Sequence, residues 1–378
     1  MVIDIIGSGI GGLTAAIALE KKGFYPRVYE KANTLKTVGA GIILASNAMQ
    51  VYKILGLDEE LKSNGISLNA MNITDDKLQV LSKVDLTYFK DKFNIQSLAI
   101  HRGKLQQVLL NNLKRTELVL DHKLQNIRKH DSGWHLDFEN STSIKSSLVI
   151  GADGIHSKIR TTLFPKSEIR SMKQVCWRGV TKFELPASYK NELNEAWGVG
   201  DRFAFVRFAP DHIYWYAVKS FTESKNEFSE DKLSVYFRKY PAIVQKIINA
   251  TPTNLLHTSV MQDLKPIKKW YDDFLCLIGD AAHATTPNMG QGACQSIEDA
   301  YVLADCLSKQ TGTNAFRAYQ NLRMAKAHQV VKQSRQIGKI SHWTSSAGIA
   351  FRNTMLKMVP NTVTQMQLEK LFELGKQD

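Results

Sequence analysis

Three glycines near the start of the chain have the spacing of a phosphate-binding loop. The segment GSGIGG places Gly7, Gly9 and Gly12 after the apolar run VIDII and before the helical pattern TAAIALEKKG. In such a loop the first glycine allows a tight turn, the second admits a pyrophosphate, and the third lets helix and strand pack closely. The N-terminus of the helix adds partial positive charge. The segment therefore predicts a dinucleotide site.

An acidic residue stands where such a site needs one. Glu30 ends the next predicted strand, YPRVYE, about 20 residues after the loop. A carboxylate there accepts hydrogen bonds from both ribose hydroxyls and repels a 2′-phosphate, so we expect NAD or FAD in this site and not NADP. Its neighbour Lys31 is included among the expected cofactor-binding residues.

A second loop, LIGDAAHATTPNMGQGACQSIEDA at 277–300, decides between the two cofactors. A simple NAD dehydrogenase has no need of it, whereas FAD extends far beyond its ADP half. Asp280 can accept a hydrogen bond from a ribityl hydroxyl. The helix starting near Gly292 can point its N-terminus at the flavin N1–C2=O edge, which becomes anionic on reduction. We therefore expect loops from opposite ends of the chain to hold one FAD.

Together, GSGIGG, GADGIHSKIR and GDAAHATTPNMGQGACQSIEDA resemble the group A flavoprotein monooxygenases, which have the para-hydroxybenzoate hydroxylase fold. The pattern is most similar to FAD-dependent urate hydroxylase, 3-hydroxybenzoate 6-hydroxylase and zeaxanthin epoxidase. The resemblance implies an enzyme that uses NADH or NADPH and O2 to hydroxylate a small aromatic or heteroaromatic substrate through a flavin C4a-hydroperoxide. It also implies that the nicotinamide cofactor is a transient electron donor.

The resemblance assigns further cofactor-binding residues by position. Asp153 and Gly154 match a pair implicated in both FAD and nicotinamide binding, and Arg102 matches an arginine that reaches the FAD phosphate or ribityl region. The segment VGAGIILASNAMQ, which contains Gly41, matches a loop beside the isoalloxazine, with Ser46 where relatives often have proline. The residues that match the ribityl and flavin-ring loops are Gly279, Asp280, Pro287, Gly290, Gln291 and Gly292.

The expected catalytic residues are Arg202, Tyr214, His283 and Pro287. Such a mechanism needs no protein nucleophile, only a dry pocket and an oriented substrate. Arg202 and Tyr214 match substrate-contacting positions in the urate-hydroxylase-like relatives, and a guanidinium there would pair with a carboxylate or enolate. Alternatively, both are ordinary sheet-edge residues. His283 is a candidate proton relay or a packed motif histidine.

The elements that would position these loops indicate an α/β fold with a discontinuous domain. Residues 172–219 alternate and are rich in aromatic residues, as in an antiparallel sheet, residues 229–248 are expected to be helical, and residues 67–90 form short strands with polar turns. Helix is expected from about 314 to the end. The resemblance implies a Rossmann-like FAD-binding domain, an inserted antiparallel β-sheet substrate domain and a C-terminal helical segment, with limits of 1–68, 101–170 and 262–341, of 69–100 and 171–261, and of 342–378, respectively.

Composition limits the other possibilities. The four cysteines lack metal-ligand spacing, so we expect buried thiols and no metal. The net charge of +13 is spread over scattered lysines and arginines, so we expect no nucleic-acid partner. The chain has no apolar run of membrane-spanning length and no export signal, and we expect no stable membrane insertion, a cytoplasmic location, and a monomer or homodimer.

Four functions remain open from the sequence. The first is an aromatic-ring hydroxylase, and the second an epoxidase or drug-inactivating monooxygenase with a larger polycyclic substrate. The third is a flavin reductase of the same fold, and the fourth a binding protein that signals through the FAD redox state. GVGDRF and GQGACQ lack the last glycine of a second dinucleotide loop, and the chain has no redox cysteine pair. A separate NAD(P)H domain is therefore not expected.

Overall fold

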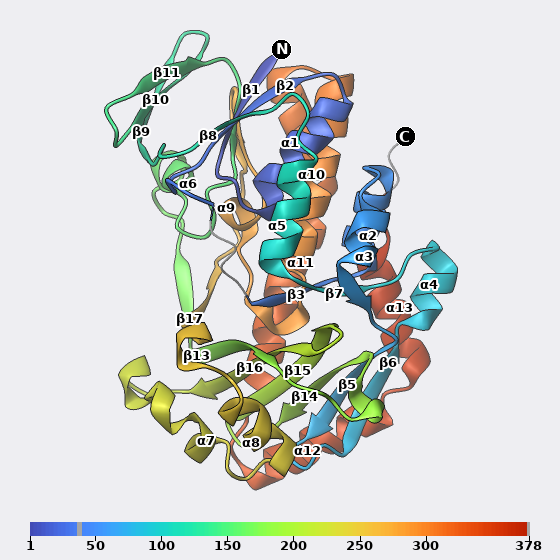
Figure 1. Cartoon of the computed structure of the whole chain (residues 1–378). Coiled ribbons are helices and arrows are strands. Elements are labelled where there is room, and N and C mark those ends of the chain that lie inside the picture. Colours follow the sequence, from blue (N-terminus) through green and yellow to red (C-terminus); the bar gives the residue numbers. More distant parts are fainter. Residues whose placement is uncertain (36–39, 376–378) are drawn as a thin grey trace.

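The computed structural model of the protein describes residues 1–35 and 40–375. Figure 1 shows two layers: an α/β part that contains the N-terminus, and a large sheet at the opposite end of the molecule. The sheet of the α/β part has the order β18-β19-β12-β1-β2-β8, and all its neighbouring strands are parallel except β18 and β19. Its strands are β1 (Val2–Ile6), β2 (Tyr25–Tyr29), β8 (Glu117–Val119), β12 (Val149–Gly151), β18 (Tyr271–Asp272) and β19 (Leu275–Leu277).

The large sheet has the order β17-β13-β16-β15-β14-β5-β6 and is antiparallel apart from the β14–β5 pair. Its strands are β5 (Ala70–Asp75), β6 (Val80–Asp85), β13 (Ile169–Lys182), β14 (Glu192–Trp197), β15 (Asp201–Ala209), β16 (His212–Ser220) and β17 (His257–Leu264). Two small antiparallel sheets complete the strands: β3 (Gly41–Leu44), β7 (Leu98–His101) and β4 (Gly65–Ser67), and β9 (Leu124–His130), β10 (Gly133–Phe138) and β11 (Ser143–Ser146).

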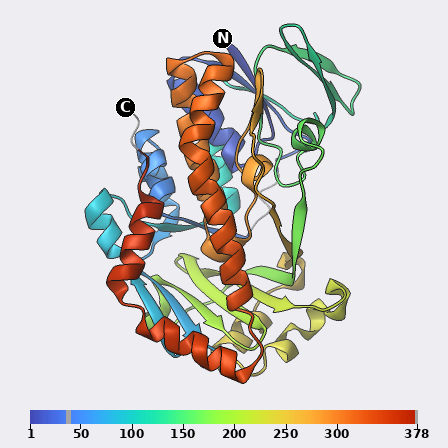
Figure 2. The same ribbon diagram turned by 180° about the vertical axis from the view of Figure 1, so that it is seen from behind.

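Helices cover the parallel sheet and connect the two layers. The helices up to residue 163, together with the short α9, are α1 (Ile10–Lys21), α2 (Ser46–Ile54), α3 (Asp58–Ser63), α4 (Thr87–Phe93), α5 (Arg102–Asn111), α6 (Lys158–Leu163) and α9 (Asp280–His283). The others are α7 (Leu233–Tyr236), α8 (Ala242–Asn249), α10 (Gly292–Lys309), α11 (Gly312–Ile340), α12 (Ser346–Met358) and α13 (Asn361–Phe372). Figure 2 shows the long α11 running from the α/β part to the large sheet.

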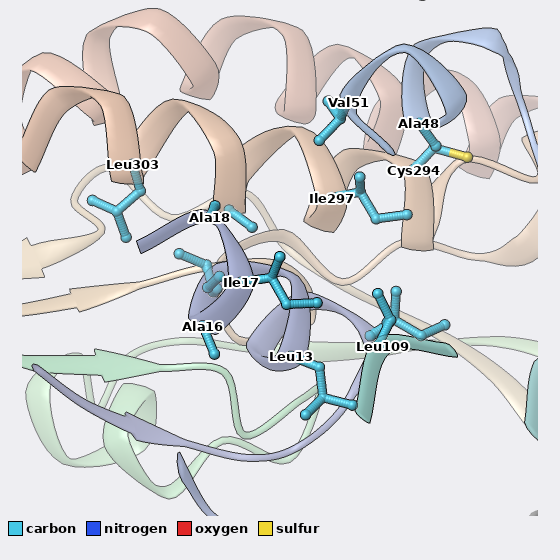
Figure 3. Packing of buried hydrophobic residues seen from close by; sticks show 14 of the residues in the cluster. Leu13, Ala16, Ile17, Ala18, Ala48, Val51, Leu109, Cys294, Ile297 and Leu303 are labelled. Carbon is cyan, nitrogen blue, oxygen red and sulfur yellow. The ribbon is translucent and has the colours of Figure 1, made fainter. Parts of the chain in front are cut away.

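The main core lies between α1 and α10, the helices that follow the two glycine loops. Figure 3 shows Ile17 of α1 on the side of Ile297 and Leu303 of α10, Val51 of α2 next to Ile297, and Leu13 on the other side of α1. All five side chains belong to one buried cluster. Because each loop leads directly into one of these helices, their packing fixes the positions of the loops relative to each other.

The two faces of the large sheet have different partners. Trp177, Phe203, Phe205 and Trp215 form a second buried cluster with residues of α7 and α8. Tyr216 lies on the opposite face, as strand alternation requires, and packs against the main core. The first four side chains are buried, while Tyr216 is only partly buried.

The α/β class and the C-terminal helical region agree with the sequence prediction, and two local predictions hold only in part. The helix expected at 229–248 is divided, because α7 ends at Tyr236 and α8 begins only after Pro241. Proline lacks the N–H of a helix interior and disfavours helix at the residue before it. The strand-rich stretch at 67–90 ends in α4, where buried Phe89 packs edge-on against Phe372 with ring centroids 4.9 Å apart. That partner is almost 300 residues away in the sequence and left no local signal.

Candidate functional site

The first glycine loop has an open side and a packed side. A Cβ atom at Gly12 would lie 2.0 Å from the Gly7 carbonyl oxygen, and one at Gly7 would lie 2.5 Å from the Ala152 oxygen. At Gly9, a Cβ would meet nothing within 4 Å. Gly9 is also the N-cap of α1, and no side chain caps that end of the helix. The loop thus leaves room beside free helix N–H groups, as a pyrophosphate requires.

Glu30 lies beside this opening. Its Oε2 accepts hydrogen bonds from the Ser8 N–H (2.9 Å) and hydroxyl (2.8 Å), and its Oε1 accepts one from the Ala32 N–H (3.0 Å). These contacts hold the carboxylate in a cavity of about 400 Å³ lined by Ser8, Gly9, Glu30, Ala32, Asn33, Thr34, Leu35 and Gln106. Lys31 is exposed at its edge. The cavity has the size and acceptor that a ribose and its base need.

The second glycine loop reaches the same edge of the parallel sheet. Ile6 of β1 is level with Gly151 of β12, and Gly151 is level with Leu277 of β19. The residues that follow these parallel strands therefore lie side by side at their carboxyl ends, where open α/β sheets bind ligands. This register brings Gly7, Asp153 and Gly279 together, although 272 residues separate the first from the last.

Asp280 follows Gly279, which has a φ of 57° and donates its N–H to Asp299 Oδ2 at 2.9 Å. The Asp280 residue is exposed to solvent, but many protein atoms lie around its carboxylate. Burial raises the pKa of this carboxyl, while His283, Arg102 and Arg160 act against the rise. Within the described residues it accepts no side-chain hydrogen bond, so it is available to a hydroxyl group.

The Asp153–Gly154 pair offers another unused acceptor. Asp153 Oδ2 accepts a hydrogen bond from the Ile159 N–H at 3.2 Å, but its buried Oδ1 has no partner among the described residues. Gly154 has a φ of 80° and open space where a Cβ would stand. Arg160, which the sequence analysis missed, donates to the carbonyls of Ile155 (2.5 Å) and Ala281 (3.1 Å) and so joins this turn to the Asp280 loop. An unpaired buried carboxylate oxygen is costly without a ligand.

The loop after α9 has a similar opening. Gly290 has a φ of 63° and open space around it, Pro287 is exposed, and Gly292 begins α10, whose N-terminus has no side-chain cap. The Gln291 side chain is buried and accepts hydrogen bonds from Asn47 (3.0 Å) and Gln295 (3.1 Å). The arrangement leaves the end of an 18-residue helix free to face an anionic group.

His283 lies beneath this loop in a buried ionic network. Its Nε2 is 2.5 Å from Asp299 Oδ2, and Arg323 donates its Nε–H to Asp299 Oδ1 at 2.8 Å. Burial alone would raise the pKa of Asp299, but His283 and Arg323 hold it well below its usual range. Arg323 also contacts Glu298, which Lys326 joins at 2.8 Å. This position is compatible both with a proton relay and with a packed motif histidine. No sequence pattern indicated Asp299 and Arg323 as the partners of His283.

Arg202 and Tyr214 lie on the face of the large sheet that is turned toward the glycine loops. The Arg202 guanidinium is 1 % exposed and donates to Glu195 (2.7 Å), Asn288 (2.6 Å) and His342 Nε2 (3.0 Å). It therefore ties the sheet to the loop that contains Pro287. Tyr214 is partly buried, and a Cβ at Gly41 would lie 2.4 Å from its Cβ. Residues 40–50 of the segment predicted to pass the isoalloxazine thus meet the sheet at Tyr214, while Val38 and Gly39 lie outside the described residues.

Electrostatics connect this face to the cofactor loops. Burial raises the pKa of Tyr214 well above its usual value, with Arg178 and Arg102 acting in the opposite direction. The charge of the exposed Arg102 also acts against the rise in the pKa of Asp280. No cluster of three or more potential metal ligands occurs within residues 1–35 and 40–375. None of the helices in those ranges is long and apolar enough to cross a membrane.

The chain is similar to known flavoproteins over nearly its whole length. A family model described as "FAD binding domain" matches residues 1–334. The aurachin C monooxygenase/isomerase of Stigmatella aurantiaca is 32% identical, covering 95% of this chain and 94% of that protein. The 2-heptyl-3-hydroxy-4(1H)-quinolone synthase of Pseudomonas aeruginosa is 31% identical over 98% of both. An FAD-dependent urate hydroxylase of Klebsiella pneumoniae is 27% identical, covering 89% of this chain and 90% of that enzyme.

The fold agrees with this relationship. The structure of Klebsiella pneumoniae HpxO with FAD and uric acid superposes with a TM-score of 0.88 at 23% identity, covering 98% of this chain and 96% of that one. The open glycine loops, the free Asp280 carboxylate and the unpaired Asp153 oxygen fit an FAD molecule. The chain belongs to the FAD-binding domain family and is an FAD-dependent monooxygenase of the aromatic-hydroxylase type.

Proposed function

We propose that the protein uses FAD, NADH or NADPH, and O2 to hydroxylate a planar heteroaromatic ring that carries a carbonyl or ionised oxygen as a substituent. The observation that carries this proposal is the crossing of Gly41 over Tyr214, since it sets the inner face of the large sheet against the loops that would hold FAD. In this arrangement a flat ring would lie between that face and the isoalloxazine. Bound FAD would accept reducing equivalents from the nicotinamide and activate O2.

The cofactor would be held by residues from both loops. We propose that the pyrophosphate lies over Gly9 and the free N-terminus of α1, that the ribose meets Glu30, and that the ribityl chain meets Asp280. The other proposed cofactor-binding residues are Gly7, Gly12, Lys31, Gly41, Arg102, Asp153, Gly154, Gly279, Gly290, Gln291 and Gly292. The contacts described above support this assignment, since they leave open space and unused acceptors along one continuous edge.

The protein's chemical contribution would be orientation and exclusion of water. Tyr214 and Tyr216 are protonated at neutral pH, as phenols ordinarily are, and burial raises the pKa of both further. Both can therefore donate hydrogen bonds to an oxygen attached to the substrate ring. We propose that Pro287 borders the flavin ring, and that His283 acts on the loop through Asp299. Arg202 would act on the same loop through Asn288.

The relatives narrow the substrate class. Two of them are named for an aurachin and for a 4-quinolone with a heptyl chain and a 3-hydroxyl group, and a third for urate. All three are similar to this chain over most of its length, and the quinolone and urate are flat nitrogen heterocycles with carbonyl oxygens on the ring. Val180 pairs with Tyr214 across β13 and β16, and Ile42 and Ile43 of β3 pack against the same core cluster as the two tyrosines. These partly buried apolar side chains favour a substrate with an apolar substituent.

The test uses purified protein. We expect about one FAD per chain, identified after heat release, and NAD(P)H consumption that rises when 2-heptyl-4-quinolone or urate is added. The product should be a hydroxylated ring. Protein that binds FAD but transfers electrons to a ligand without oxygenating it would instead indicate a flavin reductase. A colourless protein that FAD cannot reconstitute would contradict the cofactor assignment.

A further inference from the structure

The inner face of the large sheet carries a second arginine that the sequence analysis did not single out. Arg178 in β13 pairs with Tyr216 in β16, which pairs with Ala204 in β15. Residues that are directly opposite in neighbouring strands share a face. Tyr214, two residues before Tyr216, shares it as well. Arg178 and the two tyrosines therefore form one polar group, with the tyrosine ring centroids 6.1 Å apart.

This polar group faces the cofactor loops. The backbone at Gly41 touches Tyr214, and the Arg102 charge acts on both Tyr214 and Asp280. The opposite face of the same strands is filled by Trp177, Trp215 and their buried neighbours under α7 and α8. Arg178 is thus on the side of the sheet where a ring would meet the flavin.

The Arg178 guanidinium has fewer hydrogen-bond partners in the protein than the Arg202 guanidinium. The side chain of Arg178 is partly exposed, and its Nη1 donates to the Ser259 hydroxyl at 2.7 Å. A guanidinium has five N–H donors. Arg178 also interacts with the Tyr214 hydroxyl, and among the described residues none of its nitrogens is a buried polar atom without a partner. Arg202 is almost fully buried and divides its nitrogens among three protein partners.

We propose that Arg178, with the hydroxyls of Tyr214 and Tyr216, binds the carbonyl or ionised oxygen of the heteroaromatic substrate and so determines which ring the enzyme accepts. This inference rests on the proposed function and goes beyond it by naming the anchoring residue and the substrate group. A planar guanidinium can give two parallel hydrogen bonds to such an oxygen and its ring neighbour. Arg202 then acts as a positioning residue that holds the Asn288 loop.

The experiment measures ligand binding to the FAD-loaded protein without NAD(P)H, through the change in flavin absorbance on titration. The probes are 2-heptyl-4-quinolone and urate, which carry carbonyl oxygens on the ring, and 2-heptylquinoline, which lacks this oxygen. The variants are Arg178→Met, Arg178→Lys and Tyr216→Phe. Arg207→Met is the matched control, because Arg207 lies on the same sheet, pairs with Ile213 of the opposite face and is also partly buried.

The expected result is specific to the oxygen. Arg178→Met should raise the Kd of an oxygen-bearing probe about ten- to hundredfold, and Tyr216→Phe should raise it severalfold. Arg178→Lys should restore part of the loss, since it keeps the charge but not the planar fork. The Kd of 2-heptylquinoline should be unaffected by Arg178→Met, and Arg207→Met should change no Kd. FAD content should remain equal in all variants.

Several results would overturn the inference. An unchanged Kd for the oxygen-bearing probes in Arg178→Met would remove Arg178 from the site. An equal loss for 2-heptylquinoline would assign Arg178 to packing, and binding of no probe to the unaltered protein would remove the proposed substrate class. The proposed function is tested separately: if binding depends on Arg178 but no product forms with NAD(P)H and O2, the anchor stands and the hydroxylase proposal fails.

Discussion

Gly9 and Gly12 illustrate at the scale of single residues how one motif serves both fold and ligand. The G-x-G-x-x-G spacing predicts all of its glycines equally, but in the structure Gly9 and Gly12 have different surroundings. Gly12 is needed because the Gly7 carbonyl occupies the place of its Cβ, whereas Gly9 has free space on that side. The motif could be read from the sequence because it is local. The role of each glycine depends on what the rest of the chain places opposite it.

This difference gives a prediction for two matched variants. Gly9→Val should keep the fold and strongly lower FAD occupancy, because the valine side chain fills the space over the helix N-terminus. Gly12→Val should instead destabilise the protein, because its Cβ would overlap backbone. Far-UV circular dichroism, thermal unfolding and flavin content distinguish the two. Full flavin occupancy in Gly9→Val would contradict the placement of the pyrophosphate.

The pair of helices α10 and α11 shows at the next scale what a sequence pattern leaves out. Helical periodicity predicts both helices, but it cannot predict that Arg323 of α11 is 3 % exposed and contacts Glu298 and Asp299 of α10. Polar residues on a helix are usually expected to face solvent. Here the acidic pair follows a loop that must be held in place, and the arginine holds it. The break at Pro241, by contrast, had a local signal in the proline itself.

Arg323→Met should lower the free energy of unfolding by about 3–5 kcal/mol, because it leaves buried carboxylates without their main partner. The exposed Arg317 on the same helix supplies the control, and Arg317→Met should change stability by less than about 0.5 kcal/mol. Chemical denaturation of both variants measures the difference. Equal effects would show that the network contributes nothing beyond helix propensity.

The same variant has a predicted pH dependence. In the folded protein the pKa of Asp299 is lowered, so its stabilising contribution is present above the ordinary carboxyl pKa and is lost as pH falls. Without Arg323 this lowering should be smaller. Between about pH 5 and pH 3 the unaltered protein should therefore lose more free energy of unfolding than Arg323→Met. Parallel stability curves over that range would contradict the electrostatic explanation.

At the scale of the whole molecule, the site depends on contacts between segments far apart in the chain. Motif and resemblance could predict the FAD loops, the α/β class and the inner-sheet tyrosine, since each has a local pattern. They could not predict that Arg178 is level with Tyr216, because strand register is set by the pairing of the complete sheet. Nor could they predict that Arg202 donates hydrogen bonds to Glu195, Asn288 and His342, which come from three separate segments of the chain.

Arg202 therefore provides a prediction about communication between the layers. Arg202→Ala should raise the KM for the substrate roughly severalfold and lower the product formed per NAD(P)H, because the loop that contains Asn288 loses its charged hydrogen bond to the sheet. FAD content should remain high. Asn288→Ala, which removes only the link to the loop, should reproduce the loss of coupling in weaker form. Unchanged KM and coupling in both variants would make the link purely structural.

The central claim is that the protein inserts an atom of molecular oxygen into a heteroaromatic substrate with bound FAD. The most direct test is the mass of the product formed under 18O2 by the purified flavoprotein with NAD(P)H and 2-heptyl-4-quinolone or urate. We expect one 18O atom per product molecule and substrate-dependent consumption of NAD(P)H. A product that takes its oxygen from water, or FAD-loaded protein that reduces O2 without ever oxygenating either substrate, would contradict it.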